Sequence, residues 1–341
     1  MRFRVTKLFH RFKTYKFIDD RIVPKIGWTA GTLVVAFPVY QYLYDRRAFR
    51  TNIYISQILT RYLYAILRYS EARPSDHDFC GRTLLKLALL NGGIFIKVGQ
   101  HLSAMSHVVP KDITNHLRIL QTECSEQPIE NIKLVLREDL EELFDHFTDF
   151  EEKPLGTASI AQVHKAKLDG KEVVLKVQHL DIVKNSAEDI QLLELWSART
   201  SRWFRENFKF DWLVKEVKVL LADELDFYKE ATNATEARNS HKHLPWLVIP
   251  RIYHEYTTNR ILVMDYEPGF PIDDVEFYKK NNIDASRIVE KIGYLFNEMT
   301  FLTGFLHADP HAGNLKIRMS GPIGPVQIIL QQVLFINYPT K

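Results

Sequence analysis

The sequence predicts an α+β fold in which a long helical block precedes a sheet. Residues 46–150 repeat apolar side chains at helical spacing, and strand signals begin only near residue 152. Two alternating segments around an Asp-Gly turn then predict a β-hairpin over residues 160–178. With 341 residues, 46% of them hydrophobic, the chain is long enough for two domains with buried cores.

Charge and cysteine content argue against two classes of protein. The 45 basic and 42 acidic residues leave a net charge of only +3, so we expect no nucleic acid partner. Cys80 and Cys124 lie far apart and have no C-x-x-C spacing. We therefore expect neither a disulfide framework nor a cysteine metal site.

The segment 1–24 begins with a basic stretch that has no acidic residue before Asp19. Phe3, Leu8, Phe9, Phe12 and Phe17 offer an apolar helix face beside the lysines and arginines. An Arg/Lys-rich, acid-free start is typical of an organellar transit segment. The alternative is a basic tail.

Residues 25–45 are predicted to hold a single membrane-spanning helix. The run 26–44 has 19 residues without a charge. At about 1.5 Å per residue it would nearly span the ~30 Å hydrocarbon core. Trp28 near one end, and Tyr40, Tyr42 and Tyr44 near the other, suit the membrane interfaces. The alternatives are a buried hairpin or the relic of a signal anchor.

The remaining elements follow from apolar periodicity and from turn residues. Helices are expected at about 53–70, 81–105, 113–121, 129–143, 185–205, 211–240 and 283–303, and strands at 160–168, 173–178, 246–254, 260–266 and 326–330. The strands 246–254 and 260–266 flank a polar turn at 257–259.

A loop between strand-like segments has the place of a phosphate-covering loop. It reads Gly156-Thr-Ala158-Ser159-Ile-Ala161, where a glycine-rich loop would have G-x-G-x-x-G. Each alanine adds a Cβ that narrows the approach of the backbone to phosphates and disfavours positive φ. We expect Gly156, Ala158, Ser159 and Ala161 to face a nucleotide; the alternative is a plain tight hairpin.

Lys176 interrupts an otherwise apolar strand, 173–177. A charge in such a strand costs desolvation unless it is paired. Protein kinases present their phosphate-contacting lysine in this way. The alternative is an edge-strand lysine that reaches solvent, but the preceding loop and turn favour the phosphate role.

Two further clusters lie on predicted helices. Asp226 and Glu230 are four residues apart and would share a face, whereas Glu224 would point nearly opposite. Two acidic faces could serve two basic partners, although a solvated helix would look the same. In the helix 81–105, Lys97 and Gln100 are neighbours, and glycines there cost about 1 kcal/mol each. Such a cost indicates close packing, or backbone held near a ligand.

Asp309 and Asn314 have the Asp-x₄-Asn spacing of a kinase catalytic loop. In that loop the aspartate is a base or orients water, and the amide is a metal ligand. His307 and His311 flank Asp309, so a histidine metal site is an alternative, although two loop histidines without a carboxylate cluster are weak support for one.

The order of these motifs strongly resembles the aarF/UbiB family of atypical kinase-like proteins, and it is most similar to the animal aarF-domain-containing kinases of mitochondria. The resemblance covers roughly residues 78–330. It implies a protein-kinase-like fold with an N-terminal helical extension over the active site. It also implies that Lys176 contacts the phosphates and pairs with Glu230, and that Lys97 meets Glu224 or Asp226.

The residue patterns and the resemblance together predict the domains, and the resemblance implies a function. The domains would be the basic segment 1–24, the membrane segment 25–45, the extension 46–150 with Lys97 and Gln100, a complete N-lobe at 151–268 and a partial C-lobe at 269–341. The function would be that of an ATPase or phosphotransferase using ATP or ADP with Mg²⁺. Membrane lipid or an isoprenoid quinone intermediate of coenzyme Q synthesis would be its partner, at the mitochondrial inner membrane.

The chain departs from the family after Asp309, where it has no acidic residue. The family pattern expects a metal-holding D-x-G near Gln332, followed by a helical C-lobe. We therefore expect a C-terminally truncated form in which Mg²⁺ binding and turnover are impaired. The alternative to an enzyme is a pseudokinase scaffold that binds lipid or protein without turnover.

Overall fold

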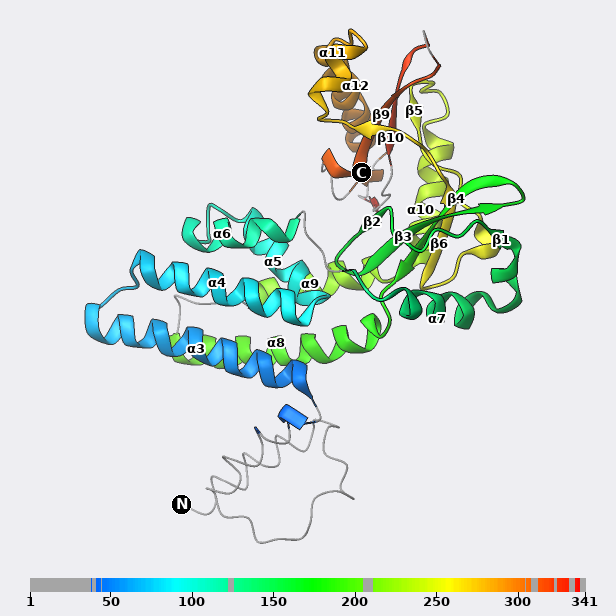
Figure 1. The fold of residues 1–341 in the computed structure, drawn as a ribbon. Helices are drawn as coiled ribbons and strands as arrows, with labels where there is room; N and C mark the ends of the chain where they lie inside the picture. Colours follow the sequence, from blue (N-terminus) through cyan, green and yellow to red (C-terminus); the bar gives the residue numbers. More distant parts are fainter. Residues whose placement is uncertain are drawn as a thin grey trace. The chain divides into compact units, whose positions relative to one another are not determined.

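The computed structural model describes residues 38, 41–43, 45–121, 126–204, 211–303, 305–307, 312–321, 324–330 and 335–337 (Figure 1). The chain divides into two compact units, residues 1–53 and residues 54–341. In the first unit helix α3 (Arg46–Tyr69) begins, and the backbone N–H of Ala48 donates to Asp45 Oδ1 at 2.9 Å. The remaining elements belong to the second unit.

A helical block precedes the sheet, as the sequence predicted. After α3 it contains α4 (Pro74–Asn91), α5 (Ile94–Ala104), α6 (Lys111–Leu117) and the 3₁₀ turn η1 (Arg118–Gln121). The expectation of one helix over 81–105 is wrong, because α4 ends at Asn91 and α5 begins at Ile94. Gly92 and Gly93 have φ of +65° and +53°, a conformation that glycine adopts readily and that no helix continues through.

A second break divides the helix expected over 211–240. After α8 (Ile182–Phe204) the chain forms α9 (Asp211–Glu224) and α10 (Phe227–Ser240), with Leu225 and Asp226 between them. Asp226 is the N-cap of α10, and its side chain accepts from the N–H of Lys229 at 3.0 Å. The two acidic residues of Glu224-x-Asp226 therefore lie at a helix junction, and the argument from faces of one helix was wrong.

The main sheet has the order β1-β3-β4-β6, and β2 also pairs with β3. Its strands are β1 (Phe147–Thr148), β2 (Gly156–Thr157), β3 (Ala161–Leu168), β4 (Lys171–Gln178) and β6 (Ile261–Asp265). The predicted hairpin is confirmed: β3 and β4 are antiparallel, and their register places Val163 opposite Lys176. Asp169 and Gly170 have φ of +51° and +78°, as a two-residue type I′ turn requires.

The two faces of β4 pack against different helices, because successive side chains of a strand point to opposite faces. Val173, Leu175 and Val177 belong to a core that includes side chains of α7 (Ile129–Leu140). Val174 lies in the larger core that includes the alanine-rich face of α10. Figure 1 shows α7 along one side of this sheet and α10 on the other. Lys176 has the parity of Val174, so it lies on the α10 side.

A second sheet has the order β5-β10-β9-β7 and consists of β5 (Leu247–Val248), β10 (Val326–Leu330), β9 (Leu315–Met319) and β7 (Phe270–Pro271). The expected strand 246–254 is only partly confirmed. Its end runs beside β6 through the bridge between Ile252 and Met264, but β5 pairs in parallel with β10. The other described elements are η2 (Glu141–His146), η4 (His254–Tyr256), α11 (Val275–Lys280), α12 (Ala285–Glu298), the π-helical turn η5 (Met299–Thr303), β8 (Phe305–His307), η6 (Ala312–Asn314) and β11 (Phe335–Asn337).

The prediction of a single-pass membrane helix is contradicted by the structure. Within the part of the chain that the structure describes, no helix has both the length and the apolar character to span a bilayer. Most of the run 26–44 lies outside the described residues. The prediction counted the absence of charge as apolar character, although the run contains glycines, threonines, a glutamine and a proline. The longest described helix, α3, carries five arginines, each costly in hydrocarbon.

Candidate functional site

The centre of the site is an ion pair between Lys176 of β4 and Glu230 of α10. Lys176 Nζ donates to Glu230 Oε1 at 2.7 Å and to Oε2 at 2.8 Å. The lysine side chain is 12% exposed and the glutamate side chain 5% exposed, so both charges are largely removed from water. Such burial is tolerated only because the charges pair with each other. The third N–H of the ammonium group is left for another acceptor.

Phe227 completes the environment of Lys176. It is the first residue of α10, it is fully buried, and the centroid of its ring lies 4.8 Å from Lys176 Nζ. A cation at this distance from an aromatic ring is attracted to it. Because side chains alternate between the two faces along β4, Lys176 lies on the α10 side of the sheet. The first turn of α10 contains both the Phe227 ring and the Glu230 carboxylate.

A second ion pair joins the helical block to α9. Lys97 Nζ of α5 pairs with Glu224 Oε1, and the two side chains are 18% and 8% exposed. The sequence offered Glu224 or Asp226 as the partner of Lys97, and the structure selects Glu224. Asp226 instead caps α10. Glu224 and Glu230 thus hold two lysines from different parts of the chain.

Gly99 and Gln100 fix α5 against η1. A Cβ added at Gly99 would overlap Leu120 Cδ1, so the helix approaches η1 more closely than alanine permits. Gln100 Nε2 donates to the carbonyl of the same Leu120 at 2.8 Å. Of the two explanations for the glycine, close packing accounts for it. Gln100 is placed as a packing residue of the extension, with its amide on the backbone of η1.

The loop 156–161 closes upon itself at the end of the sheet. Gly156 pairs with Val163, which pairs with Lys176, so the three lie in one row across three strands. The N–H of Ala158 donates to the carbonyl of Ala161 at 2.8 Å. Ser159 and Ala161 are buried, whereas Gly156 and Ala158 are exposed. The exposed backbone of this loop therefore belongs to the same end of the sheet as the ion pair.

The predicted catalytic-loop residues are only partly described. Asp309 and His311 lie outside the described residues, and the position of Gln332 does as well. Asn314 is the last residue of η6 and is half-buried. His307 ends β8, which pairs with β11. Of the predicted site residues, the structure places Lys176, Glu230 and the 156–161 loop at the same end of the sheet.

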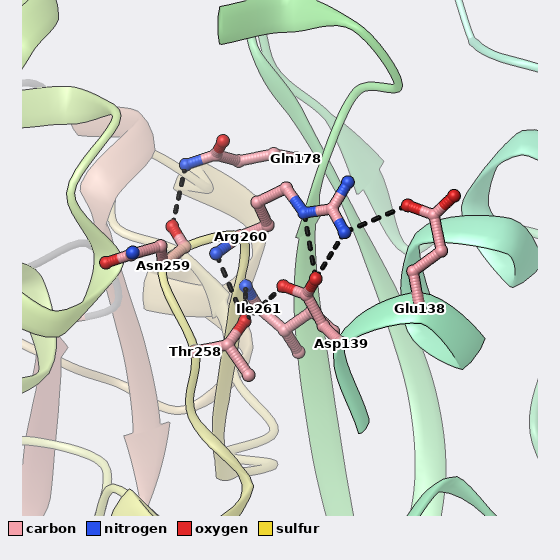
Figure 2. A network of polar contacts seen from close by, with 7 residues as sticks. All are labelled: Glu138, Asp139, Gln178, Thr258, Asn259, Arg260 and Ile261. Atoms are coloured by element: carbon pink, nitrogen blue, oxygen red, sulfur yellow. Dashed lines mark hydrogen bonds and ion pairs between the residues drawn. The ribbon is translucent and has the colours of Figure 1, made fainter. Parts of the chain in front are cut away.

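Sequence reasoning missed the polar network that joins α7 and the end of β4 to residues 258–261 (Figure 2). Arg260 bonds to Asp139 and Glu138 of α7, and the hydroxyl of Thr258 donates to Asp139 at 2.6 Å. Gln178, at the end of β4, donates to the carbonyl of Asn259 at 3.0 Å. The available signal was a glutamine as the last residue of a mostly apolar strand.

Comparison with known proteins gives the family. Residues 119–333 match the model of the ABC1 atypical kinase-like domain. The chain belongs to the ABC1 atypical kinase-like family. Relatives include AarF domain-containing kinase 1 of Drosophila melanogaster, 39% identical over 80% of this chain and 53% of the relative. AarF domain-containing protein kinase 1 of Xenopus tropicalis is 41% identical over 77% of this chain and 50% of the relative. The ABC1 family protein MCP2 homolog of Schizosaccharomyces pombe is 40% identical over 71% of this chain and 44% of the relative.

The chain spans about half the length of the curated relatives it matches. The ABC1 domain match begins in η1 and contains Lys176, Glu224 and Glu230. Lys97, Gly99 and Gln100 precede it, so the residues that anchor α5 lie in the helical block N-terminal to the matched domain. The resemblance inferred from the motifs and the α+β kinase-like fold are both confirmed.

Proposed function

We propose that this ABC1 protein binds ATP or ADP, with the phosphates held between Lys176 and the exposed backbone of the 156–161 loop. The observation that carries the proposal is the buried pair of Lys176 and Glu230. In protein kinases the lysine that contacts the phosphates is held by a glutamate in this way. Two of the three ammonium donors bond to Glu230, and the third is available to an anionic ligand.

The chemistry of the residues present fits a nucleotide. Lys176 supplies a cation in a poorly solvated environment, where it attracts phosphate strongly. Gly156 and Ala158 supply exposed backbone at the same end of the sheet. We assign Asp309 to orienting the attacking group and Asn314 to a metal contact, on the basis of their spacing. Asn314 would help to hold Mg²⁺, which would offset the negative charge of the phosphates.

We extend the proposal to ATP hydrolysis or phosphoryl transfer linked to membrane lipid or coenzyme Q metabolism. This part rests on the family resemblance. The alanines at 158 and 161 support an atypical reaction rather than ordinary protein phosphorylation, because they restrict the approach of the loop to a nucleotide. Within this proposal Lys97, Gln100, Glu224 and Asp226 organise the extension beside the nucleotide.

Calorimetry with ADP and ATP, with and without Mg²⁺, tests the proposal. Lys176→Ala should weaken binding at least tenfold, since it removes a charge-assisted contact worth about 1.5–3 kcal/mol. Lys167→Ala is the matched control: Lys167 is also a β3–β4 hairpin lysine in an ion pair, but its partner is Asp149 at the far end of the hairpin. Equal affinities for the wild type and Lys176→Ala would reject the site. Binding without hydrolysis would instead favour the pseudokinase scaffold.

A further inference from the structure

Gln178 occupies a position from which it can act on Lys176. It is the last residue of β4, two residues beyond the lysine, and therefore on the same face of the sheet. Its side chain is fully buried. Burial of an amide is costly unless its polar atoms are hydrogen-bonded, so the partners of this side chain indicate its purpose.

The side-chain amide of Gln178 joins two segments that are distant in the sequence. Nε2 donates to the carbonyl of Leu225 at 2.8 Å. It also donates to the carbonyl of Asn259 at 3.0 Å (Figure 2). Leu225 is the single residue between Glu224 and Asp226. The carbonyl of Asn259 also accepts from the N–H of Phe227 at 3.4 Å, in the first turn of α10. One side chain thus fixes the α9–α10 junction to the strand that carries Lys176.

The chemistry of these contacts requires an NH₂ group. Two carbonyl oxygens face the same atom, so a donor with two hydrogens satisfies both, whereas a carboxylate would be repelled by both. Gln178 Oε1 is buried without a hydrogen-bond partner among the described residues. The two donated bonds are therefore what this glutamine contributes to the folded chain.

We propose that Gln178 is a positioning residue for the nucleotide site and that it acts through Glu230. By fixing the junction, it sets the start of α10, and so the place where Glu230 meets Lys176. The statement about binding rests on the proposed function. The statement about geometry does not, because it concerns only contacts within the chain.

A double-mutant cycle tests the route of the effect. Gln178→Met keeps the length of the side chain and removes its donors, and we expect it to weaken ADP binding about tenfold. Gln178→Asn, whose amide is too short to reach both carbonyls, should change affinity in the same direction. Combined with Glu230→Gln, Gln178→Met should cost no more than Glu230→Gln alone, because both act on one contact. Additive losses would overturn the proposal.

The matched control is Gln162→Met. Gln162 is also a buried glutamine of the hairpin, but strand parity places it on the α7 side, where Oε1 accepts from the N–H of Gln127 at 2.5 Å. We expect ADP affinity to be unchanged in this variant. An equal loss in both variants would mean that any buried glutamine of the sheet has the effect, and the proposal would be rejected.

A second measurement needs no nucleotide. The rate at which an acylating reagent modifies Lys176, followed by mass spectrometry, reports how firmly Glu230 holds the ammonium group. We expect Gln178→Met to raise this rate several-fold while Lys167 is unaffected. If the wild type binds no ADP, the proposed function fails and this measurement still decides the positioning role. An unchanged rate at Lys176 in folded Gln178→Met would overturn it.

Discussion

Lys176 and Glu230 are 54 residues apart in the chain, yet Lys176 Nζ donates to both carboxylate oxygens of Glu230. The contact joins the central strand of a sheet to the first turn of a helix. Neither side chain could remain buried alone, because an isolated charge in this environment is costly. The ion pair therefore fixes the position of α10 relative to β4.

The ion pair between Lys97 and Glu224 should be important for stability. Lys97→Met leaves the buried carboxylate of Glu224 without its cation, and we expect a loss of about 3–5 kcal/mol in the free energy of unfolding. Lys97→Met combined with Glu224→Met should recover much of that loss. Urea unfolding provides the measurement. As the control, Lys133→Met breaks the exposed pair with Glu152 and should cost no more than about 1 kcal/mol. Similar losses in the two single variants would contradict the prediction.

Gly99→Ala should destabilise the protein by about 1–3 kcal/mol, because the added methyl group overlaps a fully buried Leu120. The control is Gly293→Ala in α12, where a Cβ meets nothing within 4 Å. There the same change should stabilise by about 0.5–1 kcal/mol through helix propensity. Thermal or urea unfolding distinguishes the two. A stabilising Gly99→Ala would show that Leu120 moves aside at little cost.

His179 should make stability depend on pH in mildly acidic solution. Burial lowers the pKa of His179 to about 4. The unfolded chain, with an ordinary pKa of about 6.5, binds a proton first as the pH falls. The contribution of His179 to the free energy of unfolding is therefore complete above about pH 6.5. It declines by roughly 3 kcal/mol as the pH falls towards about 4. His179→Leu should flatten the urea midpoint over this range, whereas the exposed His107→Ala should leave it unchanged. A wild-type midpoint that is constant between these values would refute the assignment.

A separate acid transition should arise from Asp76. Burial would raise the pKa of Asp76, but hydrogen bonds from the backbone and side chain of Arg73, and the side chain of Arg61, hold the pKa at about 2. A lowered carboxylate pKa gives stability that is complete above about pH 4 and is lost as the pH falls towards about 2. Asp76→Asn should lose about 2 kcal/mol at neutral pH and show a flatter profile between these values. Urea unfolding at pH 5 and pH 2.5 checks this.

The sequence predicted best what depends on local patterns. Alternation and the Asp169-Gly170 turn located the β3–β4 hairpin, and the lysine in an apolar strand singled out Lys176. The pairing of Lys176 with Glu230 came from the family resemblance. Both helix breaks were missed, although Gly92-Gly93 and the N-cap Asp226 were readable signals. Apolar periodicity continues across each break and conceals it.

Long-range pairing could not be read from local residues. No residue near Leu247 and Val248 indicates that β5 pairs with β10 rather than with β6, because β10 lies about 80 residues further along the chain. The contacts of Gln178 were equally invisible, since Leu225 and Asn259 accept through their backbone, which every residue has. Residue type predicts such contacts poorly.

The parity of β4 has a consequence for the tolerance of this segment to change. Insertion or deletion of a single residue between the turn and Lys176 would rotate every later side chain of the strand to the opposite face. The ammonium group would then enter the apolar layer under α7, and Leu175 or Val177 would meet Glu230. A single substitution in β4 leaves the alternation of faces intact, whereas a change in the length of β4 preserves it only if an even number of residues is added or removed. The alternation of side chains between the two faces of β4 therefore preserves the site more than any single apolar residue of the strand does.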